Sequence, residues 1–360
     1  MNIRDLYGSK AVAIVHNEAA SNKIAYLGAG LFPVDKKMGL DLKWIKTSNG
    51  LPVSLMPSNF DAVSTLRTRE GFKMDETEMA FFRESMLLKE ADRQEILRVQ
   101  EASDPYAQDV IKRVYNDAET LIEGALVVPE RMRMQLLTPP ATGSAAGSPQ
   151  ISIQANGVTY AYNYDPTGDY AANHFMEITT STLKWDDHAN SDPISDIQAG
   201  IDKVEDATGN KPELMVVSPA TMKHLRLNDN IKAAVLAQNP TANVVMNDAK
   251  VKQVIKDILA IDIVVYGKKF KNEAGVAQQF FADGYATLVP SGALGKTWFG
   301  TTPEEADLLS KADVDVTIVE TGVAVAVSTS NDPVQTKTTV SEIVLPSYER
   351  MDETFVIKCY

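Results

Sequence analysis

A long, strongly helical stretch at residues 106–137 constrains the fold of this chain more than any other segment. Its apolar residues recur at spacings of three and four, which places them on one face of an α-helix. Asp104-Pro105 opens the helix, and we expect a kink at Pro129, after which residues 132–137 continue the same face. The stripe is formed by Val110, Ile111, Val114, Ala118, Leu121, Ile122 and Ala125. Its methionines are interpreted as core filling rather than as a cofactor site.

Residues 191–310 have the order of strand, helices and strand that a compact α/β unit requires. Residues 192–209 predict an amphipathic helix with four inward positions, closed by Thr208-Gly209-Asn210. Those inward positions are Ile194, Ile197, Ile201 and Val204. Buried strands are predicted at 214–217 and 261–266, with helices near 219–238 and 247–260 between them.

The remaining regular segments are strands. Residues 151–164 alternate around Asn156-Gly157, which predicts a hairpin. Strands at 314–320 and 323–327 are joined by Thr321-Gly322, and a last pair is expected at 339–345 and 354–360. Because no helices separate these strands, we expect them to form a mainly antiparallel sheet, together with the 151–164 hairpin. The fold class is therefore α+β.

The N-terminal part of the chain is less regular. Residues 17–27 predict a short helix that Gly28, Gly30 and Pro33 end. Residues 40–83 alternate between extended segments and polar turns such as Ser48-Asn49-Gly50. These strands carry few apolar residues on their second face, so we expect a protruding hairpin that packs on a neighbouring chain.

The composition is that of an ordinary globular protein of 360 residues, with 44% hydrophobic and 23% charged residues. Since 48 acidic residues outnumber 35 basic ones, the net charge is −13, which argues against binding that neutralises many phosphates. Arg131 and Arg133 are expected on a solvated or salt-bridged helix face. No apolar run is long enough for a membrane helix, and AVAIV at 11–15 is too short for a signal core, so we expect a cytoplasmic chain that starts near Met1.

The segment GKTWFGTTPEE, residues 295–305, imitates a nucleotide-binding loop. That loop needs a glycine five places before Gly295, so that backbone N–H groups can surround phosphates. Pro290 occupies the place and has no N–H to donate, while Gly292 comes too late in the sequence. We therefore interpret Lys296 and Thr297 as part of a bent connection between a strand and a helix. In that connection Thr302-Pro303-Glu304-Glu305 provides an N-cap, a proline at the first helical position and a capping-box glutamate.

The sequence predicts no catalytic residue, no cofactor-binding residue and no metal ligand. His16, His174, His188 and His224 lie far apart, without metal-ligand spacing. His188 with Asp186 and Asp187 is the best cluster, and a solvated turn before the 192–209 helix is the favoured interpretation. Gly28-Ala29-Gly30 lacks the third glycine of a dinucleotide loop, because Pro33 stands there. Cys359 is the single cysteine, so it cannot form an intrachain disulfide, and it is interpreted as an incidental thiol.

Several strings resemble the major capsid proteins of tailed bacteriophages, in the family typified by the lambda major head protein. The specific ones are GKTWFGTTPEEADLL at 295–309, ETGVAVAV and NDPV within 320–334, and LPSYERMDETFVIK at 345–358. Weaker similarities are GAGLFP at 28–33, residues 130–137, and NGVTYAYNYD at 156–165. The resemblance extends from about residue 20 to the C-terminus.

The resemblance implies the Hong Kong 97-type capsid fold. Residues 1–39 would then be an N-terminal arm and residues 40–83 the extended loop. Residues 84–190 and 311–360 would form the peripheral domain, with 106–137 as its spine helix and an antiparallel sheet. Residues 191–310 would form the α/β axial domain.

The implied function is structural rather than enzymatic. Copies of the chain would form hexamers and pentamers of an icosahedral procapsid and virion shell around double-stranded DNA, which they would contact weakly and without sequence specificity. Other expected partners are scaffold, portal and decoration proteins, with no membrane. Assembly would take place in the cytoplasm of the bacterial host. One relative of this fold crosslinks its subunits through a lysine and an asparagine, but nothing in the spacing assigns those roles to Lys46 and Asn331.

Two alternatives belong to other classes. A shell of an encapsulin-like nanocompartment has the same fold and would enclose protein cargo. A nucleotide-binding enzyme would use Lys296 and Thr297, and ATP binding that disappears in Lys296→Ala would support it.

Overall fold

The computed structural model describes residues 9, 26–45, 74–88, 94, 106–238, 246–308, 314–331 and 334–360. The chain divides into two compact units, each assembled from segments that are far apart in the sequence. Unit 1 contains Met1–Lys43, Glu76–Met132 and Lys296–Ser347, and unit 2 contains Trp44–Asp75, Arg133–Gly295 and Tyr348–Tyr360. Residues 133–190 and 348–360, which we expected in the peripheral domain, thus cluster with most of the expected axial domain at 191–310.

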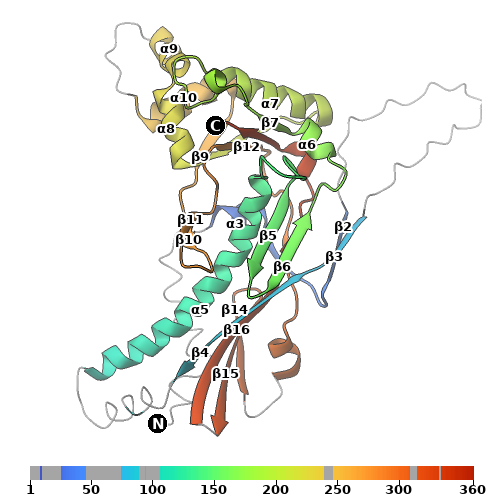
Figure 1. Ribbon diagram of the computed structural model, residues 1–360, viewed down its shortest axis with the longest axis vertical. Helices are drawn as coiled ribbons and strands as arrows, with labels where there is room; N and C mark the ends of the chain where they lie inside the picture. The colour runs from blue at the N-terminus through green and yellow to red at the C-terminus, as the bar shows by residue number, and fades with distance from the viewer. Residues whose placement is uncertain are drawn as a thin grey trace, which may run out of the picture. The chain divides into compact units, whose positions relative to one another are not determined.

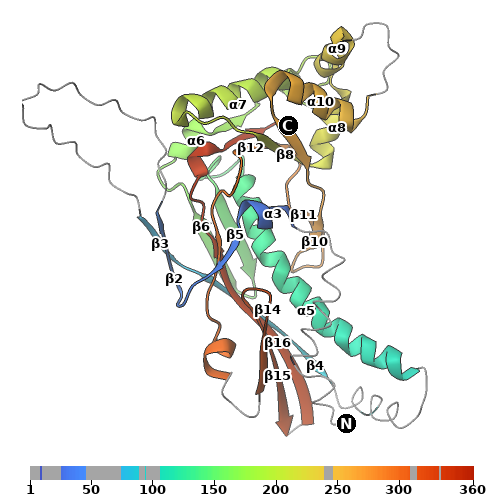
Figure 2. The ribbon, with the colours of Figure 1, turned by 180° about the vertical axis from the view of Figure 1, so that it is seen from behind.

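Unit 1 is built on a six-stranded sheet around one long strand, β16 (Val334–Pro346). Antiparallel partners of β16 are β15 (Val323–Asn331), β4 (Ala80–Leu88) and β13 (Thr297–Phe299). Strand β14 (Val314–Val319) pairs with β15, and β1 (Val34–Lys36) pairs with β13 in parallel. Strands β4, β15 and β16 lie side by side in both ribbon views (Figure 1; Figure 2).

The long helix is confirmed: α5 spans Tyr106–Leu137 and continues through Pro129. Leu121 and Ile122 are buried against sheet residues of unit 1, with Ala125 packed beside them. The sheet residues of this cluster are Val319, Val323, Val325 and Val340. The predicted apolar stripe of the helix therefore faces the core at Leu121, Ile122 and Ala125. The side chains at Val110, Ile111, Val114 and Ala118 lie outside the described ones.

Unit 2 contains a five-stranded sheet in the order β7-β17-β12-β8-β9. The strands are β7 (Phe175–Glu177), β8 (Leu214–Val217), β9 (Asp262–Val265), β12 (Tyr285–Val289) and β17 (Phe355–Lys358). Its helices are α7 (Pro193–Thr208), α8 (Pro219–Leu227), α9 (Asp229–Gln238) and α10 (Asp248–Leu259). The predicted inward residues Ile197, Ile201 and Val204 are buried in the core between α7 and the sheet, and Ile194 packs against that core.

Smaller elements complete the described chain. Unit 2 also has two hairpins. One joins β5 (Gln150–Ala155) to β6 (Val158–Asn163), and the other joins β10 (Lys269–Lys271) to β11 (Ala277–Gln279). Its short helical elements are helix α6 (Asp169–Asn173) and the 3-10 turns η1 (Ser181–Leu183) and η3 (Met351–Glu353). Strands β2 (Asp41–Ile45) and β3 (Met74–Glu78) pair with each other, so the chain leaves and re-enters the described structure through adjacent strands. Most of the predicted 40–83 excursion, residues 46–73, lies outside the described residues.

Three expectations about strands and helices are wrong. The C-terminal strand β17 pairs with β12 and β7 rather than joining the sheet of β14, β15 and β16. The β5-β6 hairpin forms a separate two-stranded sheet instead of extending that sheet. Helix α3 spans Leu27–Leu31, so Gly28 and Gly30 lie within a helix instead of ending one. The rest of the predicted 17–27 helix lies outside the described residues, apart from Tyr26.

Candidate functional site

The segment that imitates a nucleotide-binding loop forms strand β13, between β1 and β16 in the sheet of unit 1. Thr297 is fully buried: its hydroxyl donates to the Phe32 carbonyl at 3.0 Å and its N–H to the Pro33 carbonyl at 2.9 Å. Lys296 Nζ lies 2.8 Å from an Asp35 carboxylate oxygen and 5.2 Å from the centre of the Trp298 ring. Both side chains are therefore engaged in holding β1 and its approach, which is a structural role.

The chain leaves β13 through the predicted cap. The Glu305 N–H donates to the Thr302 hydroxyl at 3.3 Å, at the start of a π-helical turn, η2 (Glu304–Leu308). Glu305 forms an ion pair with Lys36 at 2.6 Å. Buried Glu304 accepts from the Ser341 hydroxyl at 2.6 Å and forms an ion pair with Arg83 at 2.8 Å. These contacts tie η2 to β1, β4 and β16. The predicted N-cap at Thr302 is confirmed, whereas the Glu305 side chain pairs with Lys36 instead of closing the predicted capping box.

The GAGLFP segment at 28–33 is held by the same region of unit 1. The Gly28 N–H donates to buried Glu130 of α5 at 3.0 Å, and Phe32 is fully buried. Parallel pairing of β1 with β13 continues this attachment to Lys36. The two segments that contain the ligand-loop-like strings GAG and GKT are thus joined to each other by backbone hydrogen bonds, through Pro33 and β1 on one side and β13 on the other.

A second polar centre lies in unit 2, where Arg350 clamps the loop after β12. Its guanidinium donates to the carbonyls of Ser291 and Ala293 at 2.9 and 3.2 Å. The same group binds both carboxylate oxygens of Glu353, which is only 2% exposed, and the Nε–Oε1 distance is 3.0 Å. The Glu349 and Arg350 N–H groups both donate to the Leu294 carbonyl. Glu349, Arg350 and Glu353 of the 345–358 string therefore have structural roles.

The histidines occupy separate places, with one exception. His174 is buried, its Nδ1 lies 3.1 Å from the Thr354 carbonyl oxygen, and burial lowers its pKa. His188 Nε2 and His224 Nδ1 are 3.0 Å apart, a pair that the sequence analysis did not predict because the two residues are distant in the chain. Among the residues that the structure describes, no group of three or more His, Cys, Asp or Glu could hold a metal ion. His16 lies outside them.

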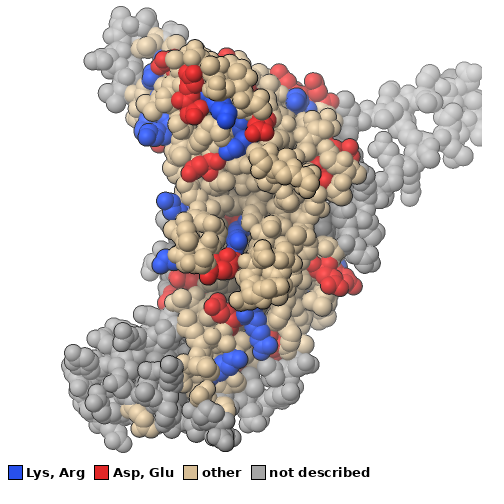
Figure 3. Space-filling model, in the orientation of Figure 1, with Lys and Arg blue, Asp and Glu red and all other residues tan. Residues whose placement is uncertain are grey.

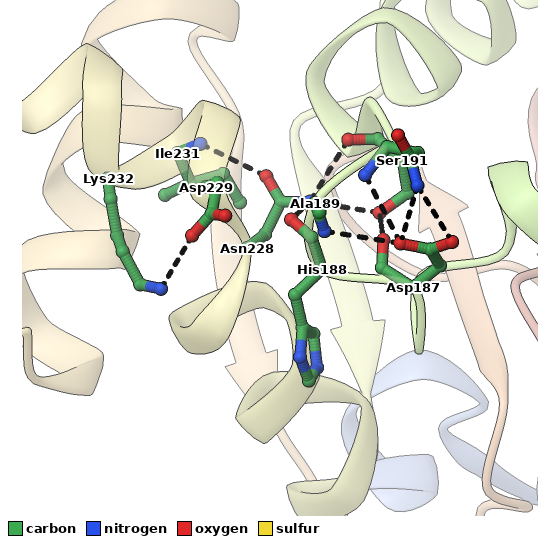
Figure 4. Close-up of polar contacts among 9 residues, drawn as sticks. Asp187, His188, Ala189, Ser191, Asn228, Asp229, Ile231 and Lys232 are labelled. Carbon is green, nitrogen blue, oxygen red and sulfur yellow. Dashed lines mark hydrogen bonds and ion pairs between the residues drawn. The ribbon is translucent and has the colours of Figure 1, made fainter.

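The predicted turn before α7 is confirmed, and it is organised by Asp187 (Figure 4). Its carboxylate accepts from the Ala189 and Asn190 N–H groups at 3.3 and 3.2 Å and from the Asn190 side chain. The Asn190 amide lowers the pKa of Asp187 below its ordinary value. In Figure 4 the His188 ring points away from these contacts. Asp187 therefore shapes a loop rather than supplying a ligand.

Asn228, at the junction of α8 and α9, holds this loop in place. Its side chain is fully buried, donates to the carbonyl and hydroxyl of Ser191 at 3.1 and 2.9 Å, and accepts from the Ile231 N–H at 3.1 Å. The Asp229 N–H donates to the His188 carbonyl at 2.9 Å beside it. Sequence periodicity could not identify Asn228, because its partners lie on a distant segment.

Asn228→Ala is expected to destabilise the unassembled chain by about 3 kcal/mol, because it removes these hydrogen bonds and leaves buried polar groups without partners. Urea unfolding measures the change. Asn190→Ala is the matched control in the same loop, where the side chain is exposed, and a cost under about 1 kcal/mol is expected there. Equal losses for the two variants would show that Asn228 is not the residue that anchors the loop.

Other sequence candidates show no reactive setting. Cys359 is fully buried and burial raises the pKa of its thiol well above the ordinary value, as suits an incidental thiol. Arg133 is only 4% exposed, so of its two expected settings, solvated or salt-bridged, burial excludes the solvated one. Lys46 and the Asn331 side chain lie outside what the structure describes.

The charges, pocket and helices of the described residues likewise show no reactive setting. Acidic and basic side chains are interspersed on the face drawn in Figure 3. A pocket of about 450 Å³ in unit 2, between the end of α5, the 138–150 loop and β5, is lined by uncharged residues alone. None of the described helices has the length and apolar character needed to cross a membrane.

Comparisons with known proteins agree on one family. The model of the family described as phage major capsid protein E matches residues 17–358. No curated protein sequence matches the chain. Among solved structures, a phage-related protein from Bordetella bronchiseptica RB50 is 14% identical with a TM-score of 0.55, over 96% of this chain and 95% of that chain.

Two further structures share the fold. A protein described as the capsid protein of a prophage of E. coli CFT073 is 12% identical with a TM-score of 0.56, over 98% of this chain and 99% of that one. The capsid of cyanophage A-1(L) is 13% identical with a TM-score of 0.51, over 92% and 91%. The fold is thus the Hong Kong 97 type of phage capsid proteins. The chain belongs to the phage major capsid protein E family, and its role is that of a structural capsid protein.

Proposed function

We propose that copies of this chain assemble into hexamers and pentamers that close an icosahedral shell around double-stranded DNA. The observation that carries this proposal is the family match over residues 17–358. The polar residues of the strings that resemble capsid proteins also support it, since Lys296, Thr297 and Arg350 hold strands and loops in place. An enzyme that binds nucleotides through Lys296 and Thr297 is disfavoured by the same contacts.

The proposed parts keep the expected boundaries, and residues 133–190 and 348–360 connect the peripheral part to the axial one, because they cluster with the axial residues. Residues 1–39 act as an N-terminal arm, 40–83 as an extended loop, 84–190 with 311–360 as the peripheral domain, and 191–310 as the axial domain. Pairing of β2 with β3 supports the extended loop, because it brings the two ends of residues 46–73 together. The loop and arm provide head-to-tail contacts, which close rings of identical subunits.

The proposed partners are other copies of the chain, a scaffold protein, a portal protein and decoration proteins. Assembly takes place in the bacterial cytoplasm, and the product is part of the virion. The net charge of −13 suits a container for DNA, because a chain with more acidic than basic residues binds phosphates weakly.

Analysis of the enclosed cargo tests the proposal against the nanocompartment alternative. Particles isolated from phage-producing cells are treated with nuclease, and their contents are then separated into nucleic acid and protein. We expect nuclease-resistant double-stranded DNA of uniform length. Particles that contain a single enzyme and no protected DNA would instead assign the chain to a nanocompartment.

A further inference from the structure

The His188–His224 pair occupies a junction of three segments of unit 2. His188 lies in the loop between η1 and α7, His224 lies in the last turn of α8, and the Tyr360 ring packs edge-on against His224 with centroids 4.8 Å apart. The two imidazole rings are also stacked, with centroids 5.3 Å apart. Both histidines are half-buried, so protons reach them.

This contact needs one hydrogen between the two facing nitrogens, and either ring can carry it. In the neutral pair, one of the facing nitrogens donates its hydrogen to the lone pair of the other. A first proton adds to an outer nitrogen and leaves this bond intact. A second proton places hydrogen on both nitrogens of each ring, so the facing atoms are two donors on two cations, and the bond is lost.

We propose that the His188–His224 hydrogen bond is an acid-sensitive latch, which holds the loop at 186–191 and the C-terminal Tyr360 on helix α8 and which opens when both rings become protonated. The opening is local, because the hydrogen bonds of Asn228 to Ser191 contain no group that titrates in this range.

The charged surroundings decide how far the pH must fall. Asp186 on the loop and Asp283 before β12 favour protonation of His224, and Lys223 on α8 opposes it. Asp187 on the loop lies next to His188, and the carboxylate of Asp229 on α9 is paired with Lys232 at 2.8 Å. Burial, followed by the neighbouring His188, lowers the pKa of His224.

The sign of the pH dependence follows from that lowered pKa. The unfolded chain takes up a proton at His224 more readily than the folded chain does, so the stability contributed by His224 is complete above about pH 6.5 and decreases as the pH falls below it.

Two measurements on the unassembled full chain test the latch. NMR of ring-labelled histidine follows the titration of each of the four histidines, and hydrogen exchange at pH 7.5 and pH 5, corrected for the intrinsic rate, follows residues 186–191 and 358–360. We expect His224 to titrate with a lowered pKa, and at least a tenfold loss of protection in these segments at pH 5. In the double variant His188→Gln with His224→Gln, whose side chains stay neutral, the loss is expected to disappear.

His174→Gln is the matched control, since it removes another histidine of unit 2 away from the pair. The acid response of residues 186–191 is expected to persist in it. The latch is overturned if the double variant loses protection at pH 5 as the unaltered chain does, or if the unaltered chain keeps its full protection at pH 5.

Discussion

Replacing residues 46–73 with a two-residue Asn-Gly turn is expected to leave a folded chain that does not build stable shells. The turn joins β2 to β3, which already pair, so their hairpin can close without the excursion. The loss of assembly follows from the proposed role of the extended loop as the contact with a neighbouring subunit. Shell formation by the unaltered chain is expected under the same conditions, and negative-stain electron microscopy counts the particles.

Circular dichroism and thermal unfolding of the shortened chain serve as the control for folding. A native-like spectrum together with a loss of at least tenfold in particle number supports the role of the loop. Shells formed by the shortened chain at normal yield would remove the extended-loop assignment, while leaving the capsid family unchanged.

Arg350→Ala is expected to destabilise the unassembled chain by about 3 kcal/mol, because it removes the guanidinium that pairs with the buried Glu353 carboxylate. The estimate is at the low end for a buried pair, since the Arg350 side chain is 29% exposed. The variant also frees the 291–294 loop, whose carbonyls accept from the guanidinium. Urea unfolding measures the loss, and Arg350→Lys is expected to recover only part of it, because an ammonium cannot reproduce the bidentate contact.

Arg226→Ala provides the matched control for this change in unit 2. Arg226 pairs with Asp248 at 3.2 Å, and both side chains are exposed, so a loss under about 1 kcal/mol is expected. If Arg350→Ala costs no more than Arg226→Ala, the clamp does not stabilise the fold as described.

Local chemistry explains which elements could be predicted from the sequence. Helix α7 was located at both ends, because Asp192 accepts from the Ser195 N–H at its start and Gly209 adopts a left-handed conformation with φ 72° at its end. Strand β8 coincides with the predicted 214–217. Each of these signals lies within a few residues of the structure that it specifies.

The errors concern contacts between distant segments. The alternation in β17 and in β16 indicates a strand in each case but carries no information about the partner, so β17 was assigned to the wrong sheet. Helix α3 contains two glycines, which local propensity disfavours, and its Gly28 is held by a hydrogen bond to Glu130 on α5. The His188–His224 pair likewise depends on the fold that brings α8 to the loop before α7.

Electron microscopy of the purified full chain, alone and with the proposed scaffold protein, shows whether copies of the chain assemble into a shell. We expect rings of six and five subunits and closed icosahedral shells whose subunit density accommodates the two units described above. Only monodisperse monomers, under every assembly condition with and without scaffold, would contradict this expectation.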